Sequence, residues 1–472
     1  MRAMRICFFA WMALLWAANL AAQEPPRADS SAALKQAVDL AREHRYAEAD
    51  AAMKGVAAPA NPTQKVAFYR LKAAIASGLK RFDSAAEDME MAAKLAPEDQ
   101  GVRIAASVAR LQAEVENHAN TAEPLKRLRN EVLPLAQAID LHLRLAEILS
   151  AANLFAEAAI DFAAASALAP DRANLLYDLA LANFRSGRLD EALQAAERSK
   201  ALEDCASIEI LLGDIQEKRG DSLAAVRSYQ QAVALEPGEE KHRLALALEL
   251  LRHQTFDAAL VVLNQSAPLF PQSVRIKILL GLTYYFVDRS ADATHALLEA
   301  ARMDSRDETA SRYLGQITLE DTATPDTAAT AQICKFADEH PASKTAGAFC
   351  GGILLRLARD SGDDTRRPEI LHRLQYAAKI APKESVARCQ LGKAYEWVEQ
   401  WSQAKPELEA CVRLDANSPD GHYQLSRVYR RLGLTQLATQ QVALQEAAAA
   451  RQSEESNRRT ETVTKFLVLL GQ

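Results

Sequence analysis

The sequence has few aromatic, glycine and proline residues, and this scarcity restricts the fold. Aromatic residues make up 6% of the 472 residues, and glycine and proline contribute 17 each, below their usual shares. Strands favour β-branched and aromatic residues, whereas alanine, which is abundant here, is the best helix former. The composition therefore predicts an all-α protein with short connections. The chain is too long for one ordinary core, so we expect several domains or a repeat array.

The chain also lacks the residue patterns of common catalytic and metal sites. The nine histidines include no pair at i, i+4, and no glycine-rich phosphate loop is present. Five cysteines follow residue 22, an odd number whose spacings match no metal pattern. They indicate neither a zinc site nor a disulfide framework, and are expected to be small buried apolar side chains. We therefore expect no catalytic, metal-binding or cofactor-binding residues, no cofactor and no enzyme activity. The five are Cys205, Cys334, Cys350, Cys389 and Cys411.

The N-terminal segment 1–22 has the layout of a secretory signal peptide. Arg2 and Arg5 precede an apolar run that begins at Ile6, and small residues stand before Gln23. This pattern predicts cleavage near Gln23, an exported protein that is periplasmic or secreted, and no stable membrane span afterwards. The alternative is an uncleaved membrane anchor, because alanine is missing three residues before the cut. The net charge of −6 disfavours nucleic acid as a partner.

One short stretch, RGDSL at 219–223, fits three interpretations. Gly220 to Leu223 spells the nucleophile block of a family of serine esterases, and Arg219 to Asp221 spells an integrin-binding tripeptide. The third interpretation is a turn between two helices. An esterase serine of this type follows a buried strand and needs a base and an oxyanion hole. The residues before Gly220 are Glu, Lys and Arg, which do not form such a strand, so the turn is favoured.

An internal repeat carries most of the information in the sequence. Alanines recur at 192, 225, 259 and 293, a period of 33 or 34 residues, and the same offsets place paired residues such as Leu212-Gly213 and Leu391-Gly392. This pattern resembles the tetratricopeptide repeat, a helix, a tight turn and a second antiparallel helix. The resemblance is to exported bacterial members of that family. It implies a right-handed α-solenoid superhelix of about twelve units, which binds peptides or helices in an inner groove.

The register assigns physical roles to the repeated positions. Small residues such as Gly392 and Ala404 let the two helices of a unit approach closely, while Tyr395 and Leu408 fill the adjacent space. Because a single pair leaves an apolar face uncovered, neighbouring pairs must stack. Gly220 falls in the turn of its unit, and Asp221 and Ser222 are expected to cap the next helix.

The predicted organisation follows this register along the chain. Pro124 and Pro134 are expected to break the degenerate segment, and loops are expected at 321–329 and 359–367. The predicted segments are the signal peptide 1–22, a linker 23–30, N-terminal repeats 31–135 with 99–135 degenerate, a central array 136–306, divergent repeats 307–383, a C-terminal pair 384–450, and a polar tail with a capping segment 451–472.

The leading functional hypothesis is an exported scaffold that binds another protein or peptide, for assembly of a cell-envelope complex. The alternative is an accessory or carrier subunit of an enzyme system, to which the divergent loops contribute. The first-helix stripe of the last two units, which also includes Cys389, Glu396 and Asp420, suits an acidic or C-terminal peptide segment. Its candidate groove residues are Lys393, Trp397, Tyr423, Arg427, Arg430 and Arg431.

Other interpretations remain open for the arginines of this stripe and for two of the cysteines. Arg430 and Arg431 stand in the last turn of a predicted helix, where cations complement the helix dipole without a ligand. The resemblance also has a gap, because the lysine and asparagine set with which chaperone-binding members hold a terminal carboxylate is missing. Cys334 and Cys350 fall on consecutive helices, so they are either bridged in an oxidising compartment or two reduced core thiols.

Overall fold

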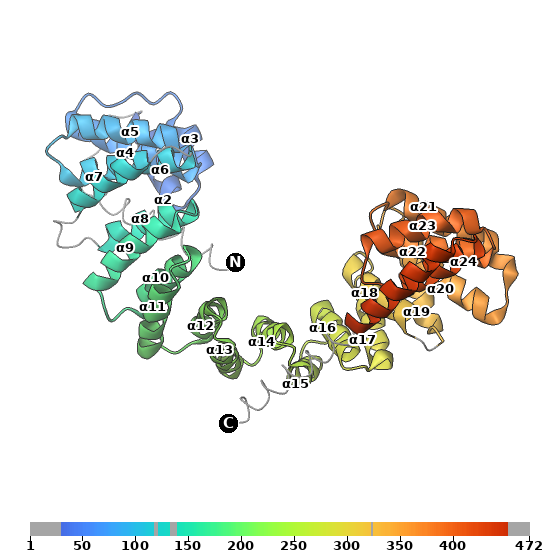
Figure 1. Ribbon diagram of the computed structural model, residues 1–472. Coiled ribbons are helices and arrows are strands. Elements are labelled where there is room, and N and C mark those ends of the chain that lie inside the picture. The colour runs from blue at the N-terminus through green and yellow to red at the C-terminus, as the bar shows by residue number, and fades with distance from the viewer. Residues whose placement is uncertain (1–29, 118–120, 133–138, 322–323, 452–472) are drawn as a thin grey trace. The chain divides into compact units, whose positions relative to one another are not determined.

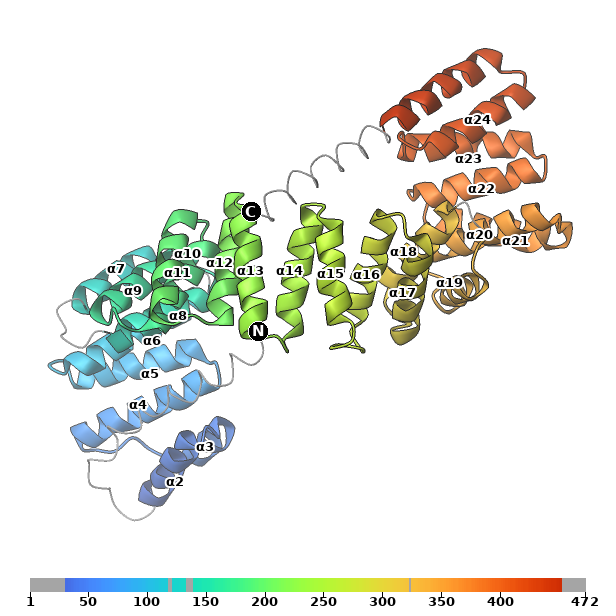
Figure 2. The same cartoon turned by 90° about the horizontal axis from the view of Figure 1, so that it is seen from below.

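The computed structural model describes residues 30–451 apart from 118–120, 133–138 and 322–323. The predicted signal peptide, Pro134 and residues 452–472 of the predicted tail lie outside this range. The described residues form helices and no strands, as expected. They divide into two compact units, Met1–Asp204 and Cys205–Gln472. Within each unit the helices lie side by side in chain order (Figures 1 and 2).

The first unit contains ten described helices in five consecutive pairs. They are α2 (Ser30–Arg42), α3 (Tyr46–Met53), α4 (Pro62–Gly78), α5 (Phe82–Leu95), α6 (Gln100–Glu116), α7 (Ala122–Val132), α8 (Ile139–Ala151), α9 (Phe155–Leu168), α10 (Ala173–Arg185) and α11 (Leu189–Leu202).

The second unit continues the same arrangement, with one short 3₁₀ turn, η1 (Asp364–Arg366), before α21. Its last pair joins α24 to a helix at 435–451. The other helices are α12 (Ala206–Arg219), α13 (Ser222–Leu235), α14 (Glu240–Arg252), α15 (Phe256–Ser266), α16 (Val274–Phe286), α17 (Ser290–Met303), α18 (Glu308–Glu320), α19 (Thr327–Glu339), α20 (Ala346–Ser361), α21 (Arg367–Ile380), α22 (Ser385–Trp397), α23 (Trp401–Leu414) and α24 (Pro419–Arg431).

The described helices therefore make twelve pairs, and the predicted all-α array of about twelve helix-turn-helix units is confirmed. The turn within each pair has a characteristic backbone. In ten of the twelve pairs one turn residue has a positive φ, between 57° and 83°, and Gly220 takes this place as expected, with Asp221 capping α13 through Ala224 N. These turn residues are His44, Lys80, Asn153, Gly187, Gly220, Gln254, Asp288, Gly362, Glu399 and Gly433.

The close contact within a pair is confirmed in the unit built from α22 and α23. A Cβ added at Gly392 would lie 2.5 Å from Cγ of Leu408, so only glycine leaves room for this leucine. Ala404 and Leu408 are fully buried, and Tyr395 packs against the same cluster. The periodic alanines Ala192, Ala225, Ala259 and Ala293 are also fully buried, which places the core between and along the pairs.

Two disulfides cross-link the second unit. Cys334 of α19 bonds Cys350 of α20, which settles that pair in favour of the bridge, and Cys389 of α22 bonds Cys411 of α23. The expectation that the chain has no disulfide framework is therefore wrong. Cys205 remains free. An odd number of cysteines does not exclude disulfides, because one unpaired thiol is compatible with two bridges among five cysteines.

Local features differ from the sequence expectations in the divergent segments. Pro124 does not break α7, because it is the third residue of the helix, where a proline replaces an N–H that has no partner within the helix. Residues 359–361 form the last turn of α20 and are not part of a loop. Asp326 caps α19 by accepting a hydrogen bond from Ala329 N, so that helix begins inside the predicted loop.

The division between the two units falls at Asp204, inside the predicted central array. The backbone at Glu203 and Cys205 is extended, with φ of −150° and −141°, whereas most other connections between pairs make compact turns. Among the described residues, no helix has both the length and the apolar character that a membrane crossing requires.

Candidate functional site

The candidate groove residues come from the first helices of the last two units. Lys393 and Trp397 lie on α22, and the other four lie on α24. The sequence of α24 separates two faces: Leu425, Val428 and Tyr429 are buried in the core, while Tyr423 is 41% exposed. Ser418 caps the helix by accepting a hydrogen bond from Gly421 N, and Pro419 occupies the first helical position, where it is well tolerated.

Lys393 holds a carboxylate supplied by the next unit. Its ammonium pairs with Oδ2 of Asp420, and Nε2 of Gln424 donates a 3.1 Å hydrogen bond to the other carboxylate oxygen. Asp420 is 54% exposed, whereas the Lys393 side chain is only 19% exposed. Gln424 is buried, and its Oε1 has no hydrogen-bond partner. These side chains form a carboxylate-binding arrangement that is already occupied from within the chain.

Arg427 makes a second contact between α22 and α24. Its Nη2 lies 3.0 Å from Oε1 of Glu396, and its guanidinium lies 5.8 Å from the centre of the Tyr423 ring. Glu396 is 5% exposed, and burial raises its pKa, although Arg427 and Arg359 oppose the rise. Neither Glu396 oxygen makes a hydrogen bond of good geometry. Arg427 remains 38% exposed, so one side of its guanidinium faces solvent.

The remaining candidates do not all converge on one surface. The ring of Trp397 lies under the Arg367 guanidinium at 5.0 Å, and Arg431 covers Trp401, the first residue of the second helix α23, at 5.4 Å. Arg430 is exposed and donates a 3.4 Å hydrogen bond to Ser426 Oγ. Arg430 and Arg431 make no ion pair with any described residue.

Cys389 does not line the groove. Its sulfur is bonded to Cys411 of α23, so it faces the partner helix within its own unit, and its assignment to the stripe is wrong. The disulfide also fixes α22, the helix that carries Lys393 and Glu396, against α23. The candidate residues of α24 that reach solvent are therefore Tyr423, one side of Arg427, Arg430 and Arg431, beside a lysine that is already paired.

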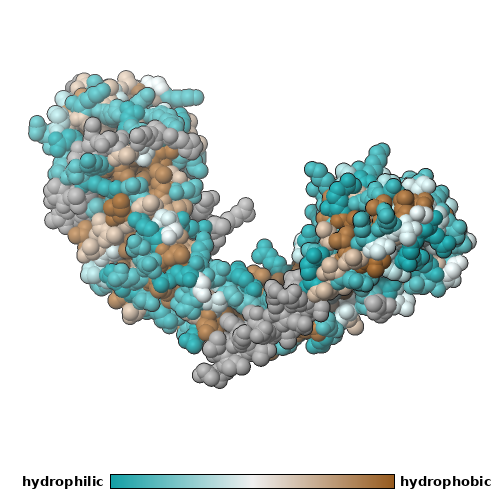
Figure 3. Space-filling view, viewed as in Figure 1, coloured by the Kyte–Doolittle hydropathy of each residue, from teal (hydrophilic) through white to brown (hydrophobic). Residues whose placement is uncertain are grey.

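The rest of the surface is less suited to a ligand of defined charge. The face seen in Figure 3 is largely hydrophilic, with hydrophobic side chains gathered in small areas of both units. The central first helices carry apolar residues, but Ile278 is buried and Ile210 packs against a core cluster. Within the described residues, no group of three or more His, Cys, Asp or Glu side chains is placed to bind a metal ion.

The esterase-like serine does have a histidine nearby. Ser222 Oγ lies 3.4 Å from Nδ1 of His253, and Nε2 of that histidine lies 3.1 Å from Oε1 of Glu249, a buried carboxylate. Ser222 is the first residue of α13 and follows a turn, whereas His253 directly follows α14. Ser222, His253 and Glu249 connect two consecutive helix pairs near their turns. The distance of 3.4 Å between Ser222 Oγ and His253 Nδ1 is long for a hydrogen bond between a hydroxyl and an imidazole. We assign these three residues a structural role.

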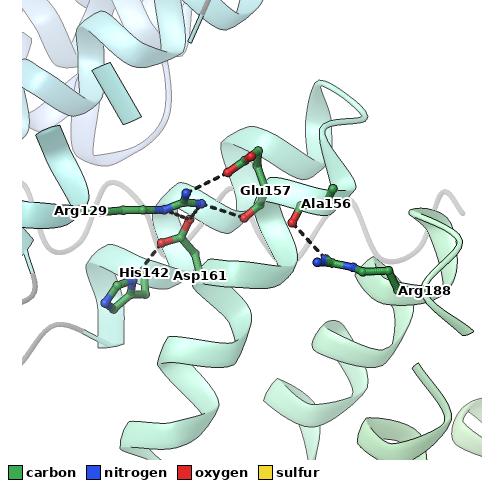
Figure 4. Close-up of polar contacts among 6 residues, drawn as sticks. All are labelled: Arg129, His142, Ala156, Glu157, Asp161 and Arg188. Atoms are coloured by element: carbon green, nitrogen blue, oxygen red, sulfur yellow. Dashed lines mark hydrogen bonds and ion pairs between the residues drawn. The ribbon is translucent and has the colours of Figure 1, made fainter. Parts of the chain in front are cut away.

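A buried charged cluster in the first unit was not anticipated from the sequence. Figure 4 shows Arg129 of α7 donating to Asp161 of α9 through Nε and Nη2, at 3.1 and 2.6 Å. His142 of α8 contacts the second oxygen of Asp161 at 2.9 Å, and Glu157 accepts from Arg129 at 2.8 Å. Asp161 is fully buried. The cluster ties the degenerate α7 to the regular pair that follows it.

Comparisons with known proteins found similarity among solved structures. No protein-family model and no curated protein matches the chain. The C-terminal part of a repeat-containing protein from Cytophaga hutchinsonii is 14% identical, with 60% of this chain and 99% of that chain aligned and a TM-score of 0.42. A thermophilic protein from Thermus thermophilus is 18% identical over 41% of this chain and all of that chain, with a TM-score of 0.34. Both are described as tetratricopeptide-repeat proteins.

Proposed function

We propose that this protein is an exported scaffold that binds an acidic segment of another protein along α22 and α24. The observation that carries the proposal is the exposed row of Tyr423, Arg427 and Arg430 on one helix face. Guanidinium groups bind carboxylates through paired hydrogen bonds, and an aromatic ring beside them supplies apolar contact area. Tyr423 and Arg427 lie against one another before any partner binds, which reduces the entropy lost on binding.

Charge favours an acidic partner over other classes of ligand at this surface. Arg430 and Arg431 have no carboxylate partner among the described residues. Arg427 has one carboxylate partner, Glu396, which is buried. The chain as a whole carries a net charge of −6, so this local cationic surface stands apart from its surroundings. A short acidic peptide that contacts only this surface would be attracted, whereas a long polyanion such as nucleic acid would extend beyond it and be repelled by the net negative charge of the chain.

Export is supported by the two disulfides as well as by the N-terminal sequence. Disulfides persist in oxidising compartments such as the periplasm and the extracellular space. Both bridges lie in the unit that contains the candidate groove. We therefore propose that the protein binds its partner in the cell envelope or outside the cell, where such a scaffold would assist assembly of an envelope complex.

The experiment that tests the binding proposal is affinity capture from envelope extracts. The protein is purified from the exported fraction, and bound proteins are compared between the wild type and a double variant, Tyr423→Ala with Arg430→Glu, which changes two exposed side chains and leaves the Arg427 and Glu396 ion pair intact. We expect the double variant to lose the captured partner while its helical circular dichroism and thermal melt stay close to those of the wild type. Undiminished capture by this variant would exclude the α24 face as the binding surface.

Export is tested separately by the intact mass of the exported protein. A mature N-terminus near Gln23 is expected, together with a mass lower by four hydrogens than that of the fully reduced chain, two for each disulfide. A mass that retains residues 1–22 would instead indicate a membrane-anchored protein.

A further inference from the structure

The carboxylate of Asp420 is held in the way that a ligand carboxylate would be held. It receives the Lys393 ammonium on one oxygen and the Gln424 amide on the other. One cation and one neutral donor, fixed on two different helices, satisfy both oxygens of a carboxylate. Gln424 is buried and its own Oε1 has no partner, so its amide is positioned by the packing of α24 and not by a hydrogen-bond network of its own.

Asp420 itself is weakly held compared with the groups that bind it. Its side chain is 54% exposed and stands in the first turn of α24, whereas Lys393 is 19% exposed. An ion pair in which one side chain is largely in solvent contributes only modestly to stability. A rotation of Asp420 into solvent would thus cost little, and would expose the Lys393 ammonium and the Gln424 amide to another carboxylate.

The two neighbouring carboxylates differ in this respect. Glu396 is 5% exposed and lies against Arg427, so it has no route into solvent and instead orients the guanidinium beside Tyr423. Asp420 is the acidic group of the groove that is free to leave. The adjacent Arg427 and Arg430 would then interact with further acidic residues of the same partner segment.

We infer that Asp420 is a built-in competitor, whose carboxylate occupies the Lys393 and Gln424 position until an acidic partner segment replaces it. This inference rests on the proposed acidic-segment binding of the same groove and adds its regulation. Binding exchanges one carboxylate for another at Lys393, which lowers affinity for isolated carboxylates and favours segments that also contact Arg427 and Arg430. Removing the charge of Asp420 should therefore tighten binding of any acidic segment.

The test is fluorescence anisotropy with the full mature chain and a labelled peptide rich in Asp and Glu that ends in a free carboxylate. Asp420→Asn removes the charge and keeps the shape of the side chain. We expect it to bind the peptide about fivefold more tightly than the wild type, equivalent to about 1 kcal/mol. The same peptide with Asn and Gln in place of its acidic residues and with an amidated C-terminus should bind equally weakly to both proteins.

Two controls separate local competition from a general change of charge. Asp338→Asn removes a similarly exposed carboxylate away from α22 and α24. Asp338 of α19 is 61% exposed, and its Oδ1 lies 2.6 Å from Nη1 of Arg373 in α21. This variant should leave the affinity unchanged. In a Lys393→Met background, Asp420→Asn should give no gain, because the contested cation is absent.

The outcomes distinguish this inference from the proposed function. If the wild type binds the acidic peptide and Asp420→Asn binds no more tightly, or gains no more than Asp338→Asn, the competition is refuted while acidic-segment binding stands. A gain that persists in the Lys393→Met background also refutes it. If neither the wild type nor Asp420→Asn prefers the acidic peptide to its neutral counterpart, the acidic-groove function itself fails, and the inference fails with it.

Discussion

The buried pair of Arg129 and Asp161 offers the sharpest test of what holds the first unit together. Substituting Arg129 with Met removes both donors to Asp161 Oδ2 and leaves a fully buried carboxylate with His142 as its remaining partner. Removing one member of a buried ion pair typically costs about 3–5 kcal/mol, because the other charge stays buried without compensation. The Arg129 side chain is itself 17% exposed, so we expect a loss near the lower end, about 3 kcal/mol.

A matched control comes from the neighbouring pair. Arg188 donates a 3.0 Å hydrogen bond to the carbonyl of Ala156 and a 3.3 Å hydrogen bond to Ser186 Oγ within its own turn, and it is drawn beside the cluster in Figure 4. Arg188→Met removes a cation and one interhelical hydrogen bond but leaves no buried charge, so its cost should be about 1 kcal/mol or less. The double variant Arg129→Met with Asp161→Asn removes the stranded charge and keeps an acceptor for His142. It should therefore be more stable than Arg129→Met alone.

The assay uses the position of the tryptophans. In the chain from residue 23 onward, the tryptophans are Trp397 and Trp401, both in the second unit. Urea unfolding followed by tryptophan fluorescence therefore reports the second unit, whereas circular dichroism at 222 nm reports both. We expect Arg129→Met to shift only the dichroism transition to lower urea. Equal losses for Arg129→Met and Arg188→Met, or a loss below about 1 kcal/mol for the first, would refute the reasoning about the buried charge.

Four further measurements test the fold and its titrating groups. Ala259 is fully buried at a helix contact and Gln230 is exposed, so Ala259→Phe should cost about 1–3 kcal/mol in urea unfolding, and Gln230→Ala almost nothing. Glu399 has a φ of 59°, in the left-handed region that glycine adopts without strain. Glu399→Gly should therefore raise the free energy of unfolding by about 0.5–1 kcal/mol in urea, because the strain that is relieved exceeds the extra backbone entropy that glycine loses on folding. Reducing the two disulfides, which span 16 and 22 residues, should lower stability by about 3 kcal/mol each, measured as melting with and without reductant. Burial, and then the charge of nearby Glu147, raise the pKa of Asp178 to about 7. The folded state therefore holds more protons than the unfolded state between about pH 4 and 7, and stability falls as pH rises through that window. Relative to the wild type, Asp178→Asn should become more stable by on the order of 1 kcal/mol between pH 5 and pH 8, measured by urea unfolding at both pH values.

The sequence predicted the repeat because the contacts that repeat are short in range. An alanine that recurs every 33 or 34 residues and a glycine that meets Leu408 are fixed by the geometry of one pair. The turn at Gly220 was found for the same reason. The equivalent turns at Lys80 and Gln254 were not, because a lysine or glutamine with positive φ leaves no compositional signal. Their conformation is imposed by the packing of the two helices around them.

The repeat register places Cys389 opposite Cys411, a disulfide that the odd number of cysteines did not suggest. In the α22 and α23 pair, Gly392 faces Leu408, and the helices run antiparallel. Moving three residues back on one helix and three forward on the other brings Cys389 opposite Cys411, which are bonded. Three residues are nearly one helical turn, so both side chains return to the facing side. The position of a cysteine in the repeat was therefore more informative than the parity of the total.

The charged contacts of the groove lie between units, where the repeat offers no guide. Lys393 and Asp420 are separated by 27 residues, and Glu396 and Arg427 by 31, and neither interval is the repeat period. The sequence predicted which side chains share the first-helix stripe, but it gave no sign that two of the cations pair with carboxylates of the chain itself. Two of them, Lys393 and Arg427, already have carboxylate partners, so the unpaired charge reduces to Arg430, Arg431 over Trp401, and the exposed side of Arg427. A partner that uses more of the groove must replace an internal ion pair, and its affinity should therefore depend on how many carboxylates it brings and fall steeply with salt.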